Sequence, residues 1–303
     1  MTVECFAESM LWHTLCVRGR VRLLVCFILV FATGLLQAEP CASAACELPL
    51  QFREGLLWME VSVAQSKEPL HFLLDSGASA SVLNLITAKQ LGLALGPKVS
   101  VNAVATTMTG HYPVKLSAKA SQLELPGEYL ALDLSKLSGA CSRSVDGLLG
   151  ADFFRDRVVE IDYAAQKLRV LAATPADTGT NSVPLETRPC GFRVAVNVNG
   201  GRSQWVRVDT GCATAFQWVT SKERAERCTS KLAVGFAELS IPQTMVGISI
   251  GNHPLDTVPT GLHRKAIFPG ESGLLGNGVL AQFGVVTIDA KSGRLVLGRA
   301  AAR

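Results

Sequence analysis

Two short segments of the chain place an aspartate in the same local setting. Residues 75–77 read Asp-Ser-Gly and residues 209–211 read Asp-Thr-Gly, each directly after an apolar stretch. One such segment alone is an ordinary turn signal. Two carboxyl groups held close together cannot both ionise, and they therefore share one proton. The ionised group can serve as general base and the protonated group as general acid. Asp75 and Asp209 are therefore the candidates for hydrolytic chemistry.

Both segments belong to a longer internal duplication. The sequence VDGLLGADFF at residues 145–154 recurs as ESGLLGNGVL at residues 271–280. The sequence VVEIDYAAQKLRVL at residues 158–171 recurs as VVTIDAKSGRLVLG at residues 285–298. Three motifs that recur in one order and at similar spacing indicate a duplicated unit, which supplies one aspartate per copy.

The elements that would position these motifs are mostly strands. Apolar residues alternate with others over residues 57–63 and 192–198, which predicts half-buried strands. The Asn-Gly-Gly sequence at residues 199–201 predicts a hairpin turn before the second aspartate. An Ile and a Leu seven residues apart close each copy and predict a final hairpin. Short helices are predicted at residues 85–91 and 221–228.

The chain divides into four predicted segments. These are a signal peptide at residues 1–38, a first lobe at residues 39–171, a linker at residues 172–183 and a second lobe at residues 184–303. The linker prediction depends on a run of small, polar and turn-forming residues.

The first 38 residues have the ordered parts of a secretory signal. Arginines precede a 14-residue apolar run at residues 23–36, and small residues follow. A bilayer span needs about 20 residues. We therefore predict cleavage after Ala38 and export to the periplasm or the extracellular space. An uncleaved membrane anchor is the alternative, and membrane contact is expected only through this segment.

Cysteine usage fits an oxidising compartment. Three of the nine cysteines lie in the predicted signal, and the six that remain could form disulfides. A bond between Cys190 and Cys228 is one candidate, but six cysteines allow many connectivities.

Composition excludes several classes of function. Hydrophobic residues make up 48% of the chain and charged residues 18%, which is enough for a packed core. The net charge of +4 includes no dense basic run, so we expect no nucleic-acid partner. No cysteine–histidine zinc spacing occurs, and we expect neither a metal nor another cofactor. The sequence also lacks Gly-x-Ser-x-Gly and His-Glu-x-x-His, which argues against a serine or metal hydrolase.

The duplicated motifs resemble those of a known family. The two Asp-Ser/Thr-Gly segments are similar to the active-site loops of aspartic peptidases, and the Gly-Leu-Leu-Gly pairs are similar to the hydrophobic-hydrophobic-Gly elements of that family. The resemblance covers residues 48–297 and is closer to two fused retropepsin-like units than to pepsin. It implies an all-β, bilobal acid-protease fold, with two homologous closed-barrel-like lobes, short helices and a cleft between the lobes.

The resemblance also implies roles for particular residues. Asp75 and Asp209 would be catalytic. Ser76 and Thr210 would hydrogen-bond across the lobe interface. The remaining residues that would shape or brace the two active-site loops are Gly77, Gly211, Leu149, Gly150, Leu275 and Gly276. The second copy departs from the family pattern at Cys212 and has Ser272 where the first has Asp146.

A turn at residues 109–112 is predicted to tip a flap over the substrate, with Gly110 at the turn and Tyr112 as its aromatic contact. His71 and His111 are interpreted as polar strand or loop positions. Cys212 is interpreted as a small buried residue, because no motif places a histidine to activate it.

These residues predict an exported aspartic endopeptidase with activity favoured below neutral pH. A catalytically inactive peptide-binding protein on the same fold is the alternative. The expected partner in both cases is an extended peptide or protein, bound through strand-like hydrogen bonds. A chain that carries both aspartates needs no second copy for catalysis, and we expect a monomer.

Overall fold

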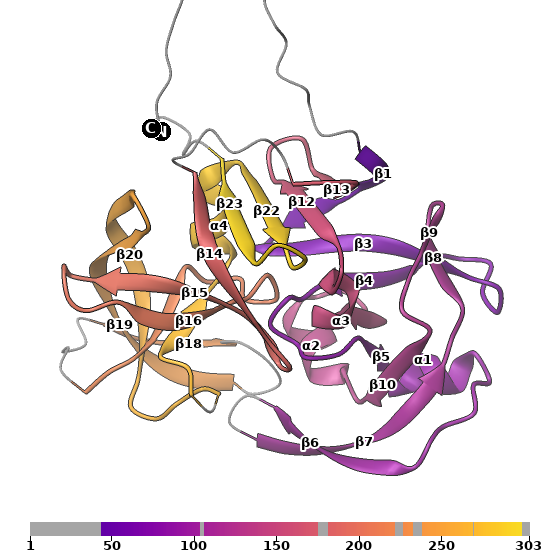
Figure 1. Cartoon of the computed structure of the whole chain (residues 1–303). Helices are drawn as coiled ribbons and strands as arrows, with labels where there is room; N and C mark the ends of the chain where they lie inside the picture. The colour runs from indigo at the N-terminus through magenta and orange to yellow at the C-terminus, as the bar shows by residue number, and fades with distance from the viewer. Residues whose placement is uncertain are drawn as a thin grey trace, which may run out of the picture. The chain divides into compact units, whose positions relative to one another are not determined.

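The computed structural model describes most of the chain after the predicted signal. The described residues are 44–103, 106–174, 181–221, 227–232, 238–268 and 270–298. Within them nearly all regular structure is β, with a few short helices (Figure 1). The predicted signal peptide lies outside the described residues. No helix in the described part of the chain is long and apolar enough to cross a membrane.

The first lobe is a sheet whose strands follow the order β6-β7-β10-β5-β11-β4-β3-β8-β9, with β2 beside β3. Its strands are β2 (Gln51–Arg53), β3 (Leu56–Val63), β4 (Leu70–Leu74), β5 (Val82–Asn84), β6 (Lys98–Ala103), β7 (Thr106–Lys115), β8 (Ala118–Ala120), β9 (Leu123–Glu124), β10 (Glu128–Leu132) and β11 (Gly147–Leu149). Its helices are α1 (Leu85–Gln90), α2 (Ser135–Ala140) and α3 (Ala151–Phe154).

The second lobe repeats this arrangement as a closed barrel. Its elements are β15 (Gly191–Val198), β16 (Gln204–Val208), β17 (Phe216–Val219), β18 (Arg227–Leu232), β19 (Glu238–Ile250), β20 (His253–His263), β21 (Gly273–Leu275), α4 (Asn277–Leu280) and a 3-10 turn at Ala281–Phe283. The order β15-β16-β21-β17-β20-β19 closes because β19 also pairs with β15. In the first lobe the strand equivalent to β19 is divided into β7, which pairs with β10, and β8, which pairs with β3.

A further set of six strands joins the two lobes. These strands are β1 (Ala44–Pro49), β12 (Val158–Asp162), β13 (Lys167–Leu171), β14 (Ser182–Arg188), β22 (Val285–Asp289) and β23 (Arg294–Leu297), and their order is β1-β13-β12-β22-β23-β14. The central contact is the antiparallel pair β12–β22, in which Glu160 lies opposite Thr287. Each half of the chain therefore contributes three strands to one continuous surface.

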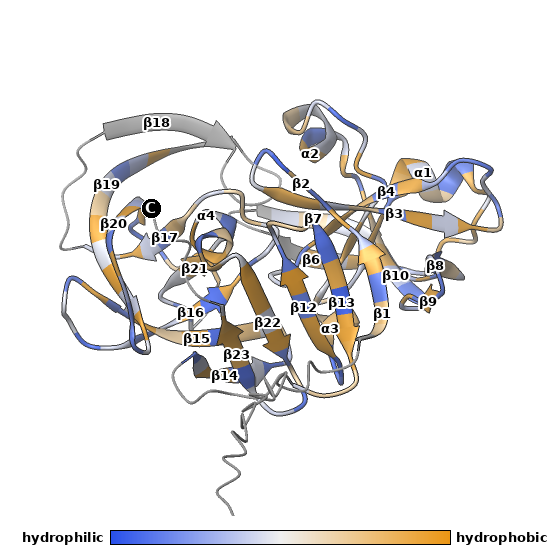
Figure 2. Ribbon diagram, turned by 90° about the horizontal axis from the view of Figure 1, so that it is seen from above, coloured by the Kyte–Doolittle hydropathy of each residue, from blue (hydrophilic) through white to orange (hydrophobic). Residues whose placement is uncertain are grey.

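The apolar pattern explains why these segments are strands. Phe192, Val194, Val196 and Val198 alternate along β15, and all four side chains are buried. Hydrophobic and hydrophilic residues are also interspersed along β12 and β13 (Figure 2). A strand that presents every second side chain to the core buries its apolar residues without burying its polar ones.

The two closing hairpins are confirmed in register. Ile161 pairs with Leu168 in β12–β13, and Ile288 pairs with Leu295 in β22–β23. The turn at residues 199–201 is confirmed as well. Asn199 and Gly200 both have positive φ, at 50° and 68°, which is the backbone that favours an Asn-Gly turn between two strands.

The prediction of a turn at residues 109–112 is wrong. These residues lie within β7, where Gly110 pairs with Val99 of β6. The glycine is needed for a close approach, since a Cβ at Gly110 would lie 2.7 Å from the carbonyl oxygen of Ala131 on β10. The chain reverses between Ala103 and Thr106 instead.

Three other predictions fall partly or wholly outside the described residues. The helix at residues 85–91 is present as α1, but most of the segment 221–228 is not described and its last two residues belong to β18. Of the predicted linker at residues 172–183, residues 175–180 are not described, and the last two residues belong to β14. The described cysteine side chains, Cys46, Cys141, Cys190 and Cys212, form no disulfide, and the side chain of Cys228 is not described.

Candidate active site

Each candidate aspartate follows the last residue of a buried strand. Asp75 follows β4 and Asp209 follows β16. Each of these strands runs parallel to the Gly-Leu-Leu strand of its own lobe, β11 or β21. The amide of Asp75 donates to the carbonyl of Leu149 over 2.9 Å, and the amide of Asp209 donates to the carbonyl of Leu275 over 3.0 Å. The Gly-Leu-Leu-Gly motifs thus hold the two loops from below in equivalent ways.

The two loops meet with their carboxyl groups in contact. The carboxyl groups of Asp75 and Asp209 lie close enough that each influences the pKa of the other. A Cβ atom at Gly77 would lie 2.4 Å from Cγ of Asp209, and one at Gly211 would lie 2.4 Å from Cγ of Asp75. The carboxyl group of each lobe therefore packs on the glycine of the other lobe. No other residue type has room at either glycine.

Backbone amides orient the carboxyl groups. Oδ1 of Asp75 accepts hydrogen bonds from the amides of Gly77 and Ala78, both over 3.0 Å. Oδ1 of Asp209 accepts one from the amide of Gly211 over 2.9 Å. One oxygen of each carboxyl group is thereby fixed within its own loop.

Burial and mutual repulsion keep a proton on the pair. Asp209 is 3% exposed, whereas Asp75 is half-buried. Burial, together with the charge of Asp75, raises the pKa of Asp209 to about 8. Burial also raises the pKa of Asp75, while hydrogen bonds from two backbone amides act to lower it. Two carboxyl groups in contact take up and release protons as a pair. The pair therefore holds one proton over a wide range of pH.

Ser76 and Thr210 connect the two loops across the lobe interface. The Ser76 amide donates to Oγ1 of Thr210 over 2.9 Å, and the Thr210 amide donates to Oγ of Ser76 over 3.1 Å. Each hydroxyl then donates to a strand of the opposite lobe: Ser76 to the carbonyl of Val208 over 2.8 Å and Thr210 to that of Leu74 over 2.9 Å. Both side chains are fully buried, so these four bonds fix the loops in register.

The last glycine of each Gly-Leu-Leu-Gly motif allows close packing on its loop. A Cβ at Gly150 would lie 2.4 Å from the carbonyl carbon of Ala80, and one at Gly276 would lie 2.3 Å from the carbonyl oxygen of Thr214. The two glycines hold the same position in the repeated Gly-Leu-Leu-Gly motif, and both are required for the same steric reason.

The second lobe contributes a buried asparagine that the sequence patterns did not single out. Asn277 donates from Nδ2 to the carbonyl of Thr210 over 2.7 Å and to that of Gly55 over 2.8 Å. Its Oδ1 accepts a hydrogen bond from the hydroxyl of Tyr163 over 2.8 Å. The first lobe has Ala151 at the equivalent position, and that difference between the copies is the sequence signal that could have found Asn277.

A second missed feature is the buried pair Arg207 and Glu271. Arg207 lies on β16, two residues before Asp209, inside an otherwise apolar stretch. Its side chain and that of Glu271 are both 3% exposed and form an ion pair over 2.7 Å. A charge in a strand is usually interpreted as an exposed position, which is why the pattern alone gave no warning.

The other residues singled out in the sequence have local contacts of their own. Asp146 accepts hydrogen bonds from the amide of His71 over 2.9 Å and from the hydroxyl of Thr87 over 2.9 Å. Cys212 is fully buried, and burial raises the pKa of its thiol to about 12. Tyr112 is exposed and donates to Glu128 over 3.2 Å. No described contact brings Tyr112 to either aspartate.

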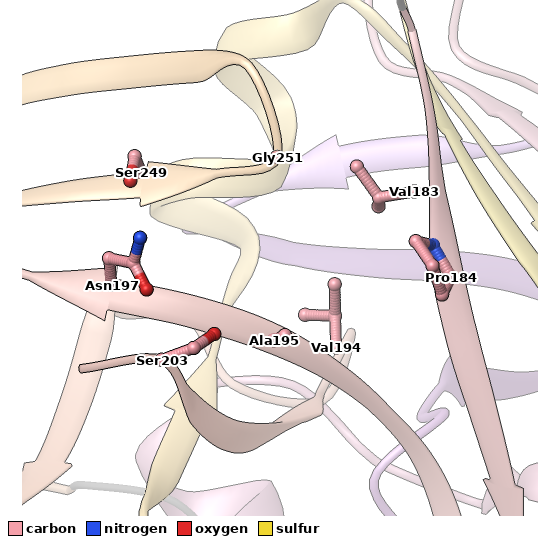
Figure 3. Close-up of a pocket in the computed structure, with 8 residues that line it drawn as sticks. All are labelled: Val183, Pro184, Val194, Ala195, Asn197, Ser203, Ser249 and Gly251. Carbon is pink, nitrogen blue, oxygen red and sulfur yellow. The ribbon is translucent and has the colours of Figure 1, made fainter.

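Two pockets differ in their distance from the active-site loops, and one of them borders a loop. One of about 670 Å³ borders the second loop and includes a residue of the first lobe. Polar and apolar residues both line it: Glu54, Ala213, Thr214, Ala215, Gln217, Gln243, Thr257, Pro259, Gly261, Gly278 and Gln282. Another, of about 170 Å³, lies between β14, β15 and the turn after β19, and it contains no residue of either loop (Figure 3). Among the described residues no group of three or more His, Cys, Asp or Glu side chains could hold a metal ion.

Comparison with known proteins agrees with this geometry. Residues 60–156 match the family of gag-polyprotein putative aspartyl proteases. The crystal structure of aspartic proteinase from Irpex lacteus is similar with a TM-score of 0.56 and 13% sequence identity, covering 84% of this chain and 97% of that one. Comparison with curated protein sequences found no match. The first lobe thus matches the aspartyl protease family by sequence, and the described chain has the fold of an aspartic proteinase.

Proposed function

We propose that the chain is an aspartic endopeptidase that hydrolyses peptide bonds with a water molecule activated between Asp75 and Asp209. The observation that carries the proposal is the contact of the two carboxyl groups, one from each lobe, with the pKa of Asp209 raised to about 8. A pair that holds one proton contains a base and an acid at the same time.

The chemistry follows from that single proton. The ionised carboxylate removes a proton from water as the water oxygen attacks the peptide carbonyl carbon. The protonated carboxyl group donates its proton to the carbonyl oxygen. Collapse of the tetrahedral intermediate breaks the carbon–nitrogen bond, and the proton taken from water passes to the leaving nitrogen. One hydroxyl of the intermediate becomes the new carbonyl group and returns its proton to the other carboxylate. The pair ends with one proton again, ready for the next peptide bond.

The substrate that fits this site is an extended peptide. The pocket of about 670 Å³ joins residues of the second loop, Ala213 to Ala215, with Glu54 of the first lobe. Its lining includes three glutamine and two threonine side chains. Gln217 binds Thr214 over 2.7 Å, and Gln282 donates to the carbonyl of Gly278 over 2.8 Å. An extended chain bound across the two loops would direct one side chain into this pocket.

Activity should depend on pH in a defined direction. The productive form carries one proton on the pair, so cleavage should fall as pH rises through about 8, where Asp209 ionises. It should also fall at low pH, once Asp75 is protonated as well. We expect the purified protein to cut an unbiased peptide mixture from acid to neutral pH, with one ¹⁸O incorporated into each new carboxyl group when the reaction runs in labelled water.

The same mixture separates this function from its alternative. A folded protein that retains peptides but produces no labelled carboxyl groups at any pH would be a binding protein instead of a peptidase.

We also propose that residues 1–38 direct export and are removed after Ala38, on the strength of the basic, apolar and small-residue pattern. The exported protein should then begin at Glu39 by N-terminal sequencing. An intact first segment in membrane fractions would favour the anchor.

A further inference from the structure

The ion pair of Arg207 and Glu271 has a geometry that few exposed pairs reach. Nε of Arg207 donates to Oε2 of Glu271 over 2.7 Å, and Nη2 donates to Oε1 over 2.7 Å. The ring of Phe268 lies 3.8 Å from Cζ of the guanidinium group. Both charged side chains are almost completely removed from water. The carboxylate thereby takes up one edge of the guanidinium group and leaves Nη1 to bind elsewhere.

The equivalent positions of the first lobe carry no charge. The duplication aligns Arg207 with Leu73 and Glu271 with Val145. Leu73 is 2% exposed and Val145 is fully buried, and both belong to an apolar cluster that includes Leu148. The same place in the fold is therefore packed well by two hydrophobic side chains. A buried ion pair is seldom more stabilising than such a pair, because both charges lose their hydration. Packing alone does not account for the charges.

The third donor of Arg207 crosses to the other lobe. Nη1 donates to the carbonyl oxygen of Gly77 over 2.6 Å. Gly77 in turn donates its amide to Oδ1 of Asp75 and packs against the carboxyl group of Asp209. Arg207 thus holds one of the two backbone segments that touch both carboxyl groups, and Gly211 belongs to the other. The first lobe makes no corresponding bond to Gly211, because Leu73 has no donor in its side chain.

We propose that Arg207, held in place by Glu271, is a positioning residue of the aspartate pair, which fixes Gly77 against both carboxyl groups from one side only. The inference depends on the proposed peptidase function for its kinetic consequences. This arrangement makes the two halves of the site electrostatically different. The guanidinium group of Arg207 contacts the first loop, whereas the equivalent position of the first lobe is the hydrocarbon side chain of Leu73.

The charge of Arg207 should also set the pH at which the pair titrates. Burial is the main influence on the pKa of both aspartates and raises it, and the nearby guanidinium group of Arg207 acts in the opposite direction on both. The ionisable groups around the pair are the two aspartates themselves, Arg207 with its partner Glu271, and the buried thiol of Cys212. Glu271 binds the edge of Arg207 formed by Nε and Nη2, while Nη1 binds the loop. Removal of the ion pair should therefore move the titration of the aspartates to higher pH.

The first lobe supplies the sequence for a test. The double variant Arg207→Leu with Glu271→Val copies the buried pair Leu73 and Val145, and it removes both charges together so that neither stays buried alone. We expect it to fold, to lose about 10- to 100-fold in kcat because Gly77 is no longer held, and to shift both limbs of its pH profile to higher pH. Carbon-13 NMR of labelled aspartate carboxyl groups should show the same upward shift without any turnover.

Two further variants separate charge from position. Arg207→Lys keeps the positive charge but loses the fixed fork of donors, so kcat should fall while the pH limbs stay near those of the wild type. The double variant Lys119→Gln with Glu124→Gln removes an exposed ion pair of the first lobe, joined over 2.6 Å, and should change neither quantity.

These experiments test the role of Arg207 and the proposed peptidase function separately. A folded Arg207→Leu/Glu271→Val protein with the kcat, pH limbs and carboxyl titration of the wild type would overturn the inference. If that protein does not fold, a wild-type kcat in Arg207→Lys would overturn it. If the wild type cuts no peptide, the proposed function is rejected. The NMR titration of the aspartate carboxyl groups would still test whether Arg207 lowers their pKa.

Discussion

Replacement of either aspartate by asparagine is expected to abolish peptide cleavage. Asparagine has the size of aspartate but can neither remove a proton from water nor share one with the opposite carboxylate. Because Asp75 and Asp209 hold one proton between them, the loss of either group removes the base and the acid together. General acid–base catalysis contributes about 10²- to 10⁴-fold per group, so we expect a loss of about 10³-fold or more in kcat for each variant. Peptide cleavage monitored by mass spectrometry measures it.

The same substitution should change how stability depends on pH. The carboxyl group of Asp209 has an ordinary aspartate pKa of 3.8 in the unfolded chain and a pKa of about 8 in the fold. Between these values the folded state binds a proton that the unfolded state has lost, so the free energy of unfolding falls as pH rises from about 4 to 8. In Asp209→Asn this decline should be smaller, and the variant should resist urea better than the wild type at pH 7.

A matched control is available in the first half of the chain. Asp156 is exposed and has a φ of 57°, a backbone conformation that asparagine adopts readily. Asp156→Asn should therefore keep both the activity and the pH dependence of the wild type. Cleavage that survived in Asp75→Asn or Asp209→Asn, at a rate within tenfold of the control, would be incompatible with a shared-proton mechanism.

A single methyl group at either active-site glycine should be nearly as damaging. In Gly77→Ala the new Cβ would lie 2.4 Å from Cγ of Asp209, and in Gly211→Ala it would lie 2.4 Å from Cγ of Asp75. Neither contact can be relieved by a flexible side-chain end, because each carboxyl group is tied to its own loop by backbone amides. The carboxyl groups must move apart, and a displacement of about 1 Å can cost about 100-fold in rate. We expect at least that loss in kcat for each variant.

The control for the glycine variants is a glycine without neighbours. A Cβ at Gly127 would meet no atom within 4 Å, and the backbone there is not left-handed. Gly127→Ala should cleave peptides at the rate of the wild type. Equal rates in Gly77→Ala and Gly127→Ala would mean that the two loops do not approach each other as closely as described.

Much of the fold could be predicted because its signals are local and repeated. The alternation at residues 192–198 is a property of a single strand, and the seven-residue spacing from Ile161 to Leu168 is a property of a single hairpin. Each pattern occurs in both halves of the chain. The same repetition identified Asp75 and Asp209. Their hydrogen-bonded neighbours Ser76 and Thr210 followed from the family resemblance, because the motif carries them with the aspartates.

What could not be predicted depends on contacts between distant residues. Gly110 was interpreted as a turn residue, but it is required by the approach of β10, which no local pattern records. Arg207 and Glu271 lie 64 residues apart, and only the folded sheet brings them together. Asn277 bonds to Gly55 across 222 residues. In all three cases the residue type is determined by a contact with a residue that is distant in the sequence.

The strand pair β12–β22 shows what joining the two halves permits. Its register makes Glu160 face Thr287, and the duplication aligns these same two positions, so they lie on the axis that relates one half to the other. In an assembly of two identical chains a residue on the axis faces its own copy, and Glu160 would face a second glutamate at repulsive distance. Here Glu160 instead binds Arg169 over 2.7 Å while Thr287 is buried. Because both halves belong to one chain, a substitution at Glu160 or Thr287 changes one side of this axis without changing the other.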